Sequence, residues 1–255
     1  MTPRILIIAG SDSGGGAGIQ ADVKTVTMLG GHAMTAITAI TAQNTLGVQR
    51  VMPVPTDMVM AQIRSCVDDI GIDAVKIGML GSAETAHAVA EWLVGVQAPV
   101  VFDPVMVATS GDVLADAATI AALHEVRARA FVTTPNLPEL EALGGLQSLL
   151  DDGETVLVKG GHGDGDEVVD RLVQHGQEIA RWSGIRIATR HTHGTGCTLS
   201  SAIATGLGRG MQLPDAIGRG IRFVRAALLA APGFGAGHGP MGHQAVRLDP
   251  DSIGG

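Results

Sequence analysis

The fold is decided by the stretch Ile5-Leu-Ile-Ile-Ala9 together with the glycine-rich segment that follows it, Gly10-Ser-Asp-Ser-Gly-Gly-Gly-Ala-Gly18. The first segment is short and continuously apolar, which is typical of a strand whose two faces are both covered by helices. A segment with helical periodicity begins at Gly18. A strand, a loop and a helix in this order predict the first unit of an α/β fold with a parallel sheet.

The same alternation of short apolar runs and helical segments continues along the chain. Further strands are expected at Met34–Thr41, Ala74–Ile77, Val100–Asp103, Ala130–Thr133 and Val156–Val158, and further helices at Thr56–Asp69, Ala83–Val94, Ala115–Arg127, Pro138–Leu149, Cys197–Gly208 and Leu213–Leu229. Two extended segments between Glu167 and Ile187 flank His175-Gly176, which predicts an antiparallel hairpin. We therefore expect one domain over residues 1–255, with a central, mostly parallel sheet, helices on both faces and a small hairpin.

Composition excludes several classes of protein. Of the 255 residues only 2% are aromatic and the net charge is -8, so a base-stacking nucleic-acid platform is not expected. No apolar run reaches the length of a membrane span. Two cysteines, Cys66 and Cys197, are too few for a disulfide scaffold in a chain of this length. A cytoplasmic protein without a membrane or nucleic-acid partner is the expectation.

The first loop contains a weak dinucleotide fingerprint, Gly16-Ala-Gly-Ile-Gln-Ala21. That fingerprint also requires a carboxylate about 20 residues later to hold a ribose, and Ala39-Ile-Thr-Ala-Gln-Asn44 offers none. A small-ligand loop is favoured over a nicotinamide site, with Asp22 and Gln43 as candidate polar contacts. The alternative for Asp22 is compensation of the helix dipole on an exposed face.

Polar residues gather at the predicted carboxyl ends of the strands, where ligands bind in such sheets. Asp103 and Glu139 are candidates to hold Mg²⁺, although an Asx turn and a helix-capping box are competing explanations. Lys159 lies beside two glycines and suits a nucleotide phosphate, unless it is a solvated charge at the sheet margin. Lys76, inside an apolar strand, is ambiguous in the same way.

The segment Thr192-His-Gly-Thr-Gly-Cys-Thr-Leu-Ser200 carries the strongest chemical signal. Its glycines lead into a helix, whose N-terminus bears roughly half a positive charge and can hold an anion. Because the chain contains no G-x-x-x-x-G-K-[ST] sequence, this turn is not a P-loop. Cys197 stands at the helix start, where the pKa of a thiol is lowered, and could accept a proton; a small buried hydrophobic role is the alternative. The pair His191 and His193 lacks further zinc ligands at recognisable spacing.

With these segments in view, the chain resembles the hydroxymethylpyrimidine/phosphomethylpyrimidine kinases of thiamine biosynthesis, in the ribokinase-like group. The resemblance runs from Ala9 to about Pro240 and rests on Ala9-Gly-Ser-Asp12, Gly15-Gly-Ala-Gly-Ile-Gln-Ala-Asp22, Ala42-Gln-Asn-Thr45, Val75-Lys-Ile-Gly-Met-Leu80, Asp103-Pro-Val-Met106, Ser110-Gly-Asp112, Thr134-Pro-Asn-Leu-Pro-Glu139, Val158-Lys-Gly-Gly-His162 and Thr192-His-Gly-Thr-Gly-Cys197. Some pyridoxal kinases look similar, so these segments are less specific for the substrate than for the family.

The resemblance implies ATP-dependent phosphorylation of 4-amino-5-hydroxymethyl-2-methylpyrimidine, and then of its monophosphate to the diphosphate, by a homodimer. It implies that Gln43 binds the pyrimidine and that Cys197 replaces the catalytic Asp of ribokinase-like sugar kinases. It also implies that Asp22, Gly10 and Met79 contact the substrate, and that Gly194, Thr195 and Gly196 form an anion hole. By the same resemblance, Asp103 and Glu139 bind Mg²⁺, and Lys159 and Thr192 contact the nucleotide.

The sequence departs from the family pattern in three places. Ser13-Gly14 replaces the usual Pro-Ser, His191 stands where Asn is usual, and the segment between Leu143 and Thr155 looks shorter by roughly one helix of 10–14 residues. A pyridoxal kinase is the nearest alternative, and a dinucleotide-binding protein is the alternative from another class.

Overall fold

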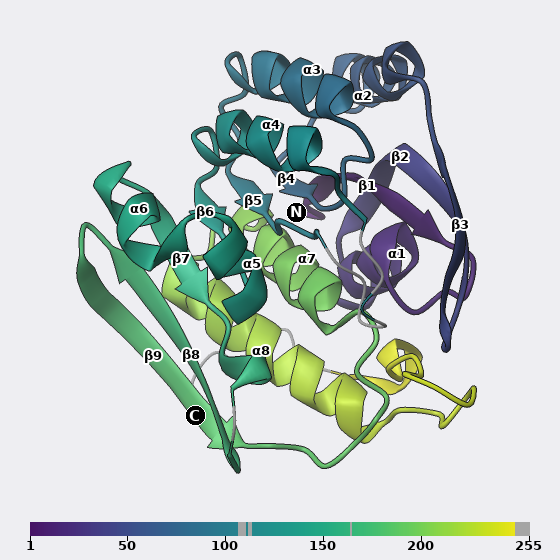
Figure 1. Cartoon of the computed structure of the whole chain (residues 1–255), viewed down its shortest axis with the longest axis vertical. Helices are drawn as coiled ribbons and strands as arrows, with labels where there is room; N and C mark the ends of the chain where they lie inside the picture. Colours follow the sequence, from purple (N-terminus) through teal and green to yellow (C-terminus); the bar gives the residue numbers. More distant parts are fainter. Residues whose placement is uncertain (107–110, 112–113, 164, 248–255) are drawn as a thin grey trace.

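A computed structural model describes residues 1–106, 111, 114–163 and 165–247. Its strands form one sheet in the order β3-β2-β1-β4-β5-β6-β7-β8-β9 (Figure 1). The strands are β1 (Arg4–Asp12), β2 (His32–Asn44), β3 (Gly47–Pro53), β4 (Ala74–Ile77), β5 (Val100–Phe102), β6 (Val132–Thr133), β7 (Thr155–Val158), β8 (Glu167–Gln174) and β9 (Gln177–Ile185). The helices are α1 (Gly18–Met28), α2 (Thr56–Asp69), α3 (Ala83–Leu93), α4 (Ala117–Arg127), α5 (Leu137–Ala142), α6 (Gly145–Asp151), α7 (Thr195–Gly208) and α8 (Leu213–Leu229), with short 3-10 turns at Gly160–His162 and His243–Ala245.

Strands β2, β1, β4, β5, β6 and β7 run parallel to one another, as the sequence predicted. The two faces of β1 explain its continuous apolar run. Leu6 and Ile8 pack with α2, α3 and α4 on one face, whereas Ile5 and Ile7 pack with α1, α7 and α8 on the other. Because both faces are buried, no polar residue can alternate with the apolar ones.

Antiparallel strands close both edges of the sheet. The predicted hairpin is confirmed as β8 and β9, which follow β7 and form the long ribbon at the left of Figure 1. The opposite edge is β3, which pairs antiparallel with β2 and which the sequence interpretation missed. Most of its residues are exposed, so it lacks the apolar pattern by which the other strands were found.

The predicted helix Pro138–Leu149 is wrong as one element. The structure has α5 and α6 there, with Gly144 between them and Gly145 at the start of α6, and the φ angles of these two glycines, 94° and 85°, are left-handed. A right-handed helix cannot continue through such residues. The segment that looked short by one helix therefore holds the seven-residue α6.

The carboxyl ends of the parallel strands face one side of the sheet. From β1 the chain crosses to β2 on one side and later to β4 on the other, so a topological switch point lies between β1 and β4. Ligands bind in such crevices. Ser110 and Asp112, which belong to one of the family-like segments, lie outside the described residues. Among the helices in the described ranges, none is long and apolar enough to cross a membrane.

Candidate active site

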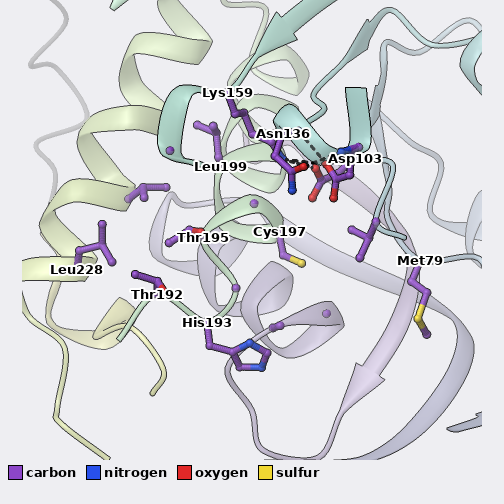
Figure 2. Close-up of a pocket in the computed structure, with 18 of the residues that line it drawn as sticks. Met79, Asp103, Asn136, Lys159, Thr192, His193, Thr195, Cys197, Leu199 and Leu228 are labelled. Carbon is purple, nitrogen blue, oxygen red and sulfur yellow. Dashed lines mark hydrogen bonds and ion pairs between the residues drawn. The ribbon is translucent and has the colours of Figure 1, made fainter. Parts of the chain in front are cut away.

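A cavity of about 640 Å³ opens at this edge of the sheet. Its lining contains every site residue predicted from the sequence except Asp22, namely Gly10, Gln43, Met79, Asp103, Glu139, Lys159, Thr192, Gly194, Thr195, Gly196 and Cys197. Figure 2 shows Cys197 between two groups of side chains, with Lys159, Asn136 and Asp103 on one side and His193 on the other. Gly10 and Cys197, which are 187 positions apart in the sequence, therefore line the same cavity at the carboxyl ends of the strands.

The turn before α7 requires glycine at its first position. Gly194 is the N-cap of α7 and has a φ angle of 84°. A Cβ atom at Gly194 would collide with the carbonyl group of Gly16 in the first loop. Since the first amides of a helix have no partner within it, and Gly194 has no side chain to accept from them, they are available to an anion in the cavity.

The same turn lies against a charged cluster. A Cβ atom on Gly196 would lie 3.2 Å from Lys159 Nζ and 3.3 Å from Asp103 Oδ2. The Lys159 ammonium is 2.7 Å from Asp103 Oδ1 and 3.9 Å from Glu139 Oε2. Thr134 Oγ1 also donates to Asp103 Oδ1 at 3.1 Å, so this carboxylate is held on a defined side of the anion site.

Glu139 is part of a helix-capping box and also lines the cavity, so both explanations that its sequence position allowed apply to it. Its carboxylate accepts a hydrogen bond from the Asn136 amide at 2.8 Å, while the Asn136 side chain accepts from the Glu139 amide, so the two form a capping box on α5. Burial nevertheless raises the pKa of Glu139 to about 7, against the attraction of Lys159 and with the added repulsion of Asp103. The capping box thus leaves a titratable carboxyl in the cavity.

The expectation of a lowered thiol pKa at Cys197 is wrong. Burial raises the pKa of the Cys197 thiol to about 12. The attraction of Lys76 and a hydrogen bond from the Gly18 amide act in the opposite direction, whereas the carboxylates of Asp22 and Asp103 add to the rise. A helix N-terminus lowers a thiol pKa where water or cations can also reach the sulfur; here the desolvation is larger.

Asp22 does not contact the cavity. Its side chain is fully buried, as is that of Lys76, and the two form an ion pair at 2.9 Å. Ser201 Oγ donates to the other carboxylate oxygen at 2.8 Å. The alternative of an exposed dipole-compensating residue is therefore wrong, and Asp22 lies beneath the site rather than within its lining.

Asp12, which the sequence interpretation missed as a site residue, pairs with His193, for which a role other than zinc binding was expected. His193 Nε2 lies 2.9 Å from Asp12 Oδ2, and Gln43 Nε2 lies 3.3 Å from the same ring nitrogen. The amides of Gly16 and Ala17 also donate to Asp12 Oδ2. Although burial opposes its ionisation, these hydrogen bonds keep the pKa of Asp12 below its usual value. Asp12 and His193 thereby tie the first loop to the turn at Gly194.

The C-terminal segment also supports this turn. The His193 amide donates to the Gly239 carbonyl at 3.3 Å, and Thr198 Oγ1 lies 2.8 Å from His243 Nε2. His243 is completely buried, and burial lowers its pKa to about 4. The part of the C-terminal segment around residues 239–243 thus packs against the first turns of α7.

A second region missed from the sequence is the apolar wall of the cavity. It is built by β9 and α8 and contains Trp182, Ile221, Val224 and Leu228. No local signal distinguishes these residues from ordinary core residues of an amphipathic helix and strand. They give the cavity an apolar face on which a flat ring could pack.

One crevice contains charged residues at the strand ends, a helix N-terminus that is not part of a P-loop, and an apolar wall. Together these features define a small-molecule kinase with a ribokinase-like α/β fold. The family model for phosphomethylpyrimidine kinase matches residues 12–242. The chain belongs to this family. It is 46% identical to the hydroxymethylpyrimidine/phosphomethylpyrimidine kinase of Streptomyces coelicolor, over 94% of each chain.

Two solved structures are similar in fold as well as in sequence. Phosphomethylpyrimidine kinase from Clostridium difficile 630 has a TM-score of 0.74 and 36% identity, covering 88% of this chain and 98% of that one. An ADP complex of pyridoxal kinase from Bacillus subtilis has a TM-score of 0.86 and 32% identity, covering 98% of this chain and 100% of that one.

Proposed function

We propose that this protein uses ATP to phosphorylate 4-amino-5-hydroxymethyl-2-methylpyrimidine and then phosphorylates the monophosphate to the diphosphate, in thiamine diphosphate biosynthesis. One observation carries the proposal. The turn Gly194–Cys197 stands in a single cavity between a Gln43–His193 side and a Lys159–Asp103 side. An acceptor and a nucleotide could therefore meet at the helix N-terminus, as phosphoryl transfer requires.

The residues divide into three roles under this proposal. Gln43, Gly10 and Met79 contact the pyrimidine, with Asp22 supporting that side from beneath the cavity. Lys159 and Thr192 contact the nucleotide, while the amides at Gly194, Thr195 and Gly196 stabilise the charge of the phosphoryl group in flight. Cys197 takes the proton from the substrate hydroxyl, so that the oxygen can form its bond to phosphorus as the bond to ADP breaks.

The test of the function is product formation by the purified protein. With ATP, Mg²⁺ and hydroxymethylpyrimidine we expect both the monophosphate and the diphosphate, separated by chromatography. Absence of ADP release and of both phosphates would contradict the proposal. The same assay with pyridoxal tests the nearest alternative, which the similarity in fold to a pyridoxal kinase favours. Tight binding of NAD without phosphorylation would indicate the dinucleotide-binding alternative.

Gln43 provides a test of the pyrimidine side. Its side chain lies between Thr41, whose hydroxyl donates to it at 3.1 Å, and His193, so its orientation is fixed before substrate binds. We expect Gln43→Ala to raise the pyrimidine KM about 2- to 12-fold, the range for one lost hydrogen bond, with little change in kcat. Steady-state kinetics with saturating ATP measure both constants. The exposed Gln49→Ala, outside the cavity, is the control, and an unchanged KM in Gln43→Ala would refute the contact.

We also propose that Asp103 and Glu139 hold Mg²⁺. The residues fit this ion, because two buried carboxylates share one ammonium partner, Lys159, and Mg²⁺ prefers carboxylate oxygens together with phosphate oxygens. When bound there, Mg²⁺ would neutralise charge on the nucleotide phosphates. The protein's own contribution is to orient both carboxylates, Asp103 through Lys159 and Thr134, and Glu139 through the Asn136 amide.

Glu139 makes this metal site sensitive to pH. Its pKa is raised to about 7, so the ionised form that can bind a cation is lost as the pH falls below that value. We expect the Mg²⁺ concentration for half-maximal rate to rise between pH 8 and pH 6. Glu139→Gln should require more Mg²⁺ at pH 8 and show little further change, whereas the exposed Glu141→Gln should behave like the parent protein. Identical Mg²⁺ titrations at both pH values in the parent protein would exclude this role.

The edge strand β3 supports a further proposal, a homodimer. Leu46 and Met52 expose 68% and 55% of their surface, and Ile40 and Val51 are also exposed beside them. An edge strand with exposed apolar residues is suited to contact with a second copy. We expect Met52→Glu to convert a dimer into a monomer in light-scattering measurements. Val94→Glu, an exposed apolar position after α3, should leave the dimer intact. A parent protein that is monomeric at micromolar concentration would contradict the proposal.

Residues 1–255 are proposed to form one domain, which the single sheet and its shared helical layers support. We propose a cytoplasmic location for it. The free thiols of Cys66 and Cys197 are consistent with a reducing compartment, and ATP is the proposed co-substrate.

A further inference from the structure

Lys76 has none of the roles proposed above, and its buried partner Asp22 only supports the pyrimidine side from beneath the cavity. Neither side chain is exposed, and a single Lys–Asp contact of 2.9 Å joins them. Removing two charges from water costs several kcal/mol, and replacing such a pair by apolar residues is often neutral or stabilising. Fold stability alone is therefore a weak explanation for a buried ion pair at the base of a ligand cavity.

Asp22, one member of the pair, is joined to α7, the helix that contains Cys197. Ser201, which donates to Asp22, follows Cys197 by four residues and so projects from the same face of α7. Lys76 lines the cavity together with Cys197. Gly78 leaves space for the ammonium, because a Cβ atom at that position would lie 2.8 Å from Lys76 Nζ.

The pKa shifts of Lys76 and Cys197 each depend on the other group, as is expected for neighbouring groups in one cavity. Burial opposes the charge on Lys76, but Asp22, the Cys197 sulfur and Asp103 together raise the pKa of Lys76 above its usual value. In return, Lys76 favours the thiolate form of Cys197. The ammonium therefore keeps its charge at neutral pH and acts on the sulfur within the shared lining of the cavity.

The other charged groups that face Cys197 favour the thiolate less than Lys76 does, or oppose it. Asp22 and Asp103 oppose the thiolate. Lys159 interacts with the sulfur as well, but Lys76 is the stronger of the two cations in lowering the pKa of the Cys197 thiol.

We propose that Lys76 is a positioning residue for phosphoryl transfer, whose ammonium, anchored by Asp22 and Ser201, stabilises the Cys197 thiolate that accepts the substrate proton. The inference rests on the proposed function, in which Cys197 is the base. The proton passes from the substrate hydroxyl to the sulfur, the oxygen attacks phosphorus, and the thiol afterwards returns the proton to solvent. Lys76 keeps its own protons throughout.

The test measures the thiolate directly rather than through activity. In a Cys66→Ser background, the rate of alkylation by iodoacetamide between pH 7 and pH 10 reports the thiolate fraction of Cys197. A charge removed from beside a titrating group shifts its pKa by about one unit or more, which is about tenfold in that fraction. We expect Lys76→Met to slow alkylation about tenfold at each pH, and Asp22→Asn to accelerate it.

Opposite signs separate this proposal from a structural role. Both variants lose the same ion pair, so loosening of the fold would move both rates in one direction, and that result would overturn the proposal. If either single variant fails to fold, as judged by circular dichroism, the double variant Lys76→Met/Asp22→Asn replaces it. Slower alkylation than in the parent supports the proposal, because the effect of Lys76 exceeds that of Asp22; an unchanged or faster rate refutes it.

Activity measurements then distinguish the proposed role of Cys197 as the base from the proposed role of Lys76. Under the proposal Lys76→Met lowers kcat and leaves the pyrimidine KM within about twofold. A fully active Cys197→Ala variant would show that Cys197 is not the general base. The alkylation rates of Lys76→Met and Asp22→Asn, relative to the parent, would still decide whether Lys76 controls the thiolate fraction of Cys197.

Discussion

Replacing Cys197 with alanine is expected to lower kcat for pyrimidine phosphorylation by about 10²–10⁴-fold, the usual contribution of a general base. The sulfur lies at the start of α7, in the cavity that contains Gln43 and Lys159. Alanine keeps the helix and the backbone amides, so only the proton acceptor is lost. The pyrimidine KM should stay within about twofold. Cys66→Ala, on α2 and away from the cavity, is the matched control.

The pH dependence of the rate sharpens this expectation. With a thiol pKa of about 12, the thiolate fraction rises about tenfold per pH unit over the whole range from pH 7 to pH 9. If the thiolate is the base, log kcat should rise with a slope near one in that range. Cys197→Ala should lose this slope along with the rate. A parent profile that is flat, or an alanine variant of near-normal rate, would leave catalysis to the backbone anion hole alone.

Gly194→Ala is expected to lower kcat about 10²–10³-fold, which is the usual effect of disrupting one donor of an anion hole. A Cβ atom at this position would collide with the Gly16 carbonyl, so either the first loop or the turn must move. The left-handed backbone adds a cost of about 1–2 kcal/mol for a non-glycine residue. The amides would then no longer face the site where the phosphoryl group passes. Kinetic assays and thermal unfolding on the same preparations separate the two effects.

A second glycine supplies the control for backbone strain. Gly210 has a φ angle of 86°, close to that of Gly194, but a Cβ atom there meets nothing within 4 Å. Gly210→Ala should therefore lower the melting temperature while leaving kcat nearly unchanged. Equal losses of kcat in both variants would show that strain, rather than the position of the turn, controls the rate.

The parallel strands could be predicted because burial on two faces leaves a simple mark in the sequence. Ile5–Ala9 and Val100–Phe102 are apolar throughout, and both are buried between helical layers. Strand β3 leaves no such mark, because Arg50, Val51 and Met52 are all exposed at the sheet edge. The break between α5 and α6 depends on left-handed backbone at two adjacent glycines, and helical periodicity alone does not reveal it.

The candidate site was predictable to the extent that topology gathers strand ends. Asp103, Glu139 and Lys159 follow neighbouring strands, and they meet as that rule requires. Asp22 follows no strand; it lies on α1, whose inner face points beneath the cavity. The contact between Asp12 and His193 spans 181 residues and depends on how two loops fold together. Pairing of that kind leaves no spacing in the sequence from which it could be inferred.

The return of the C-terminal segment to α7 bears on how the enzyme is made. Gly239 and His243 contact the residues on either side of the anion turn, His193 and Thr198. During synthesis on the ribosome, strands β1 to β9 and the turn itself emerge before these partners exist. The nascent chain could therefore pair its sheet early and still lack a finished anion hole, so that catalytic competence should appear only once residues 239–243 have left the exit tunnel.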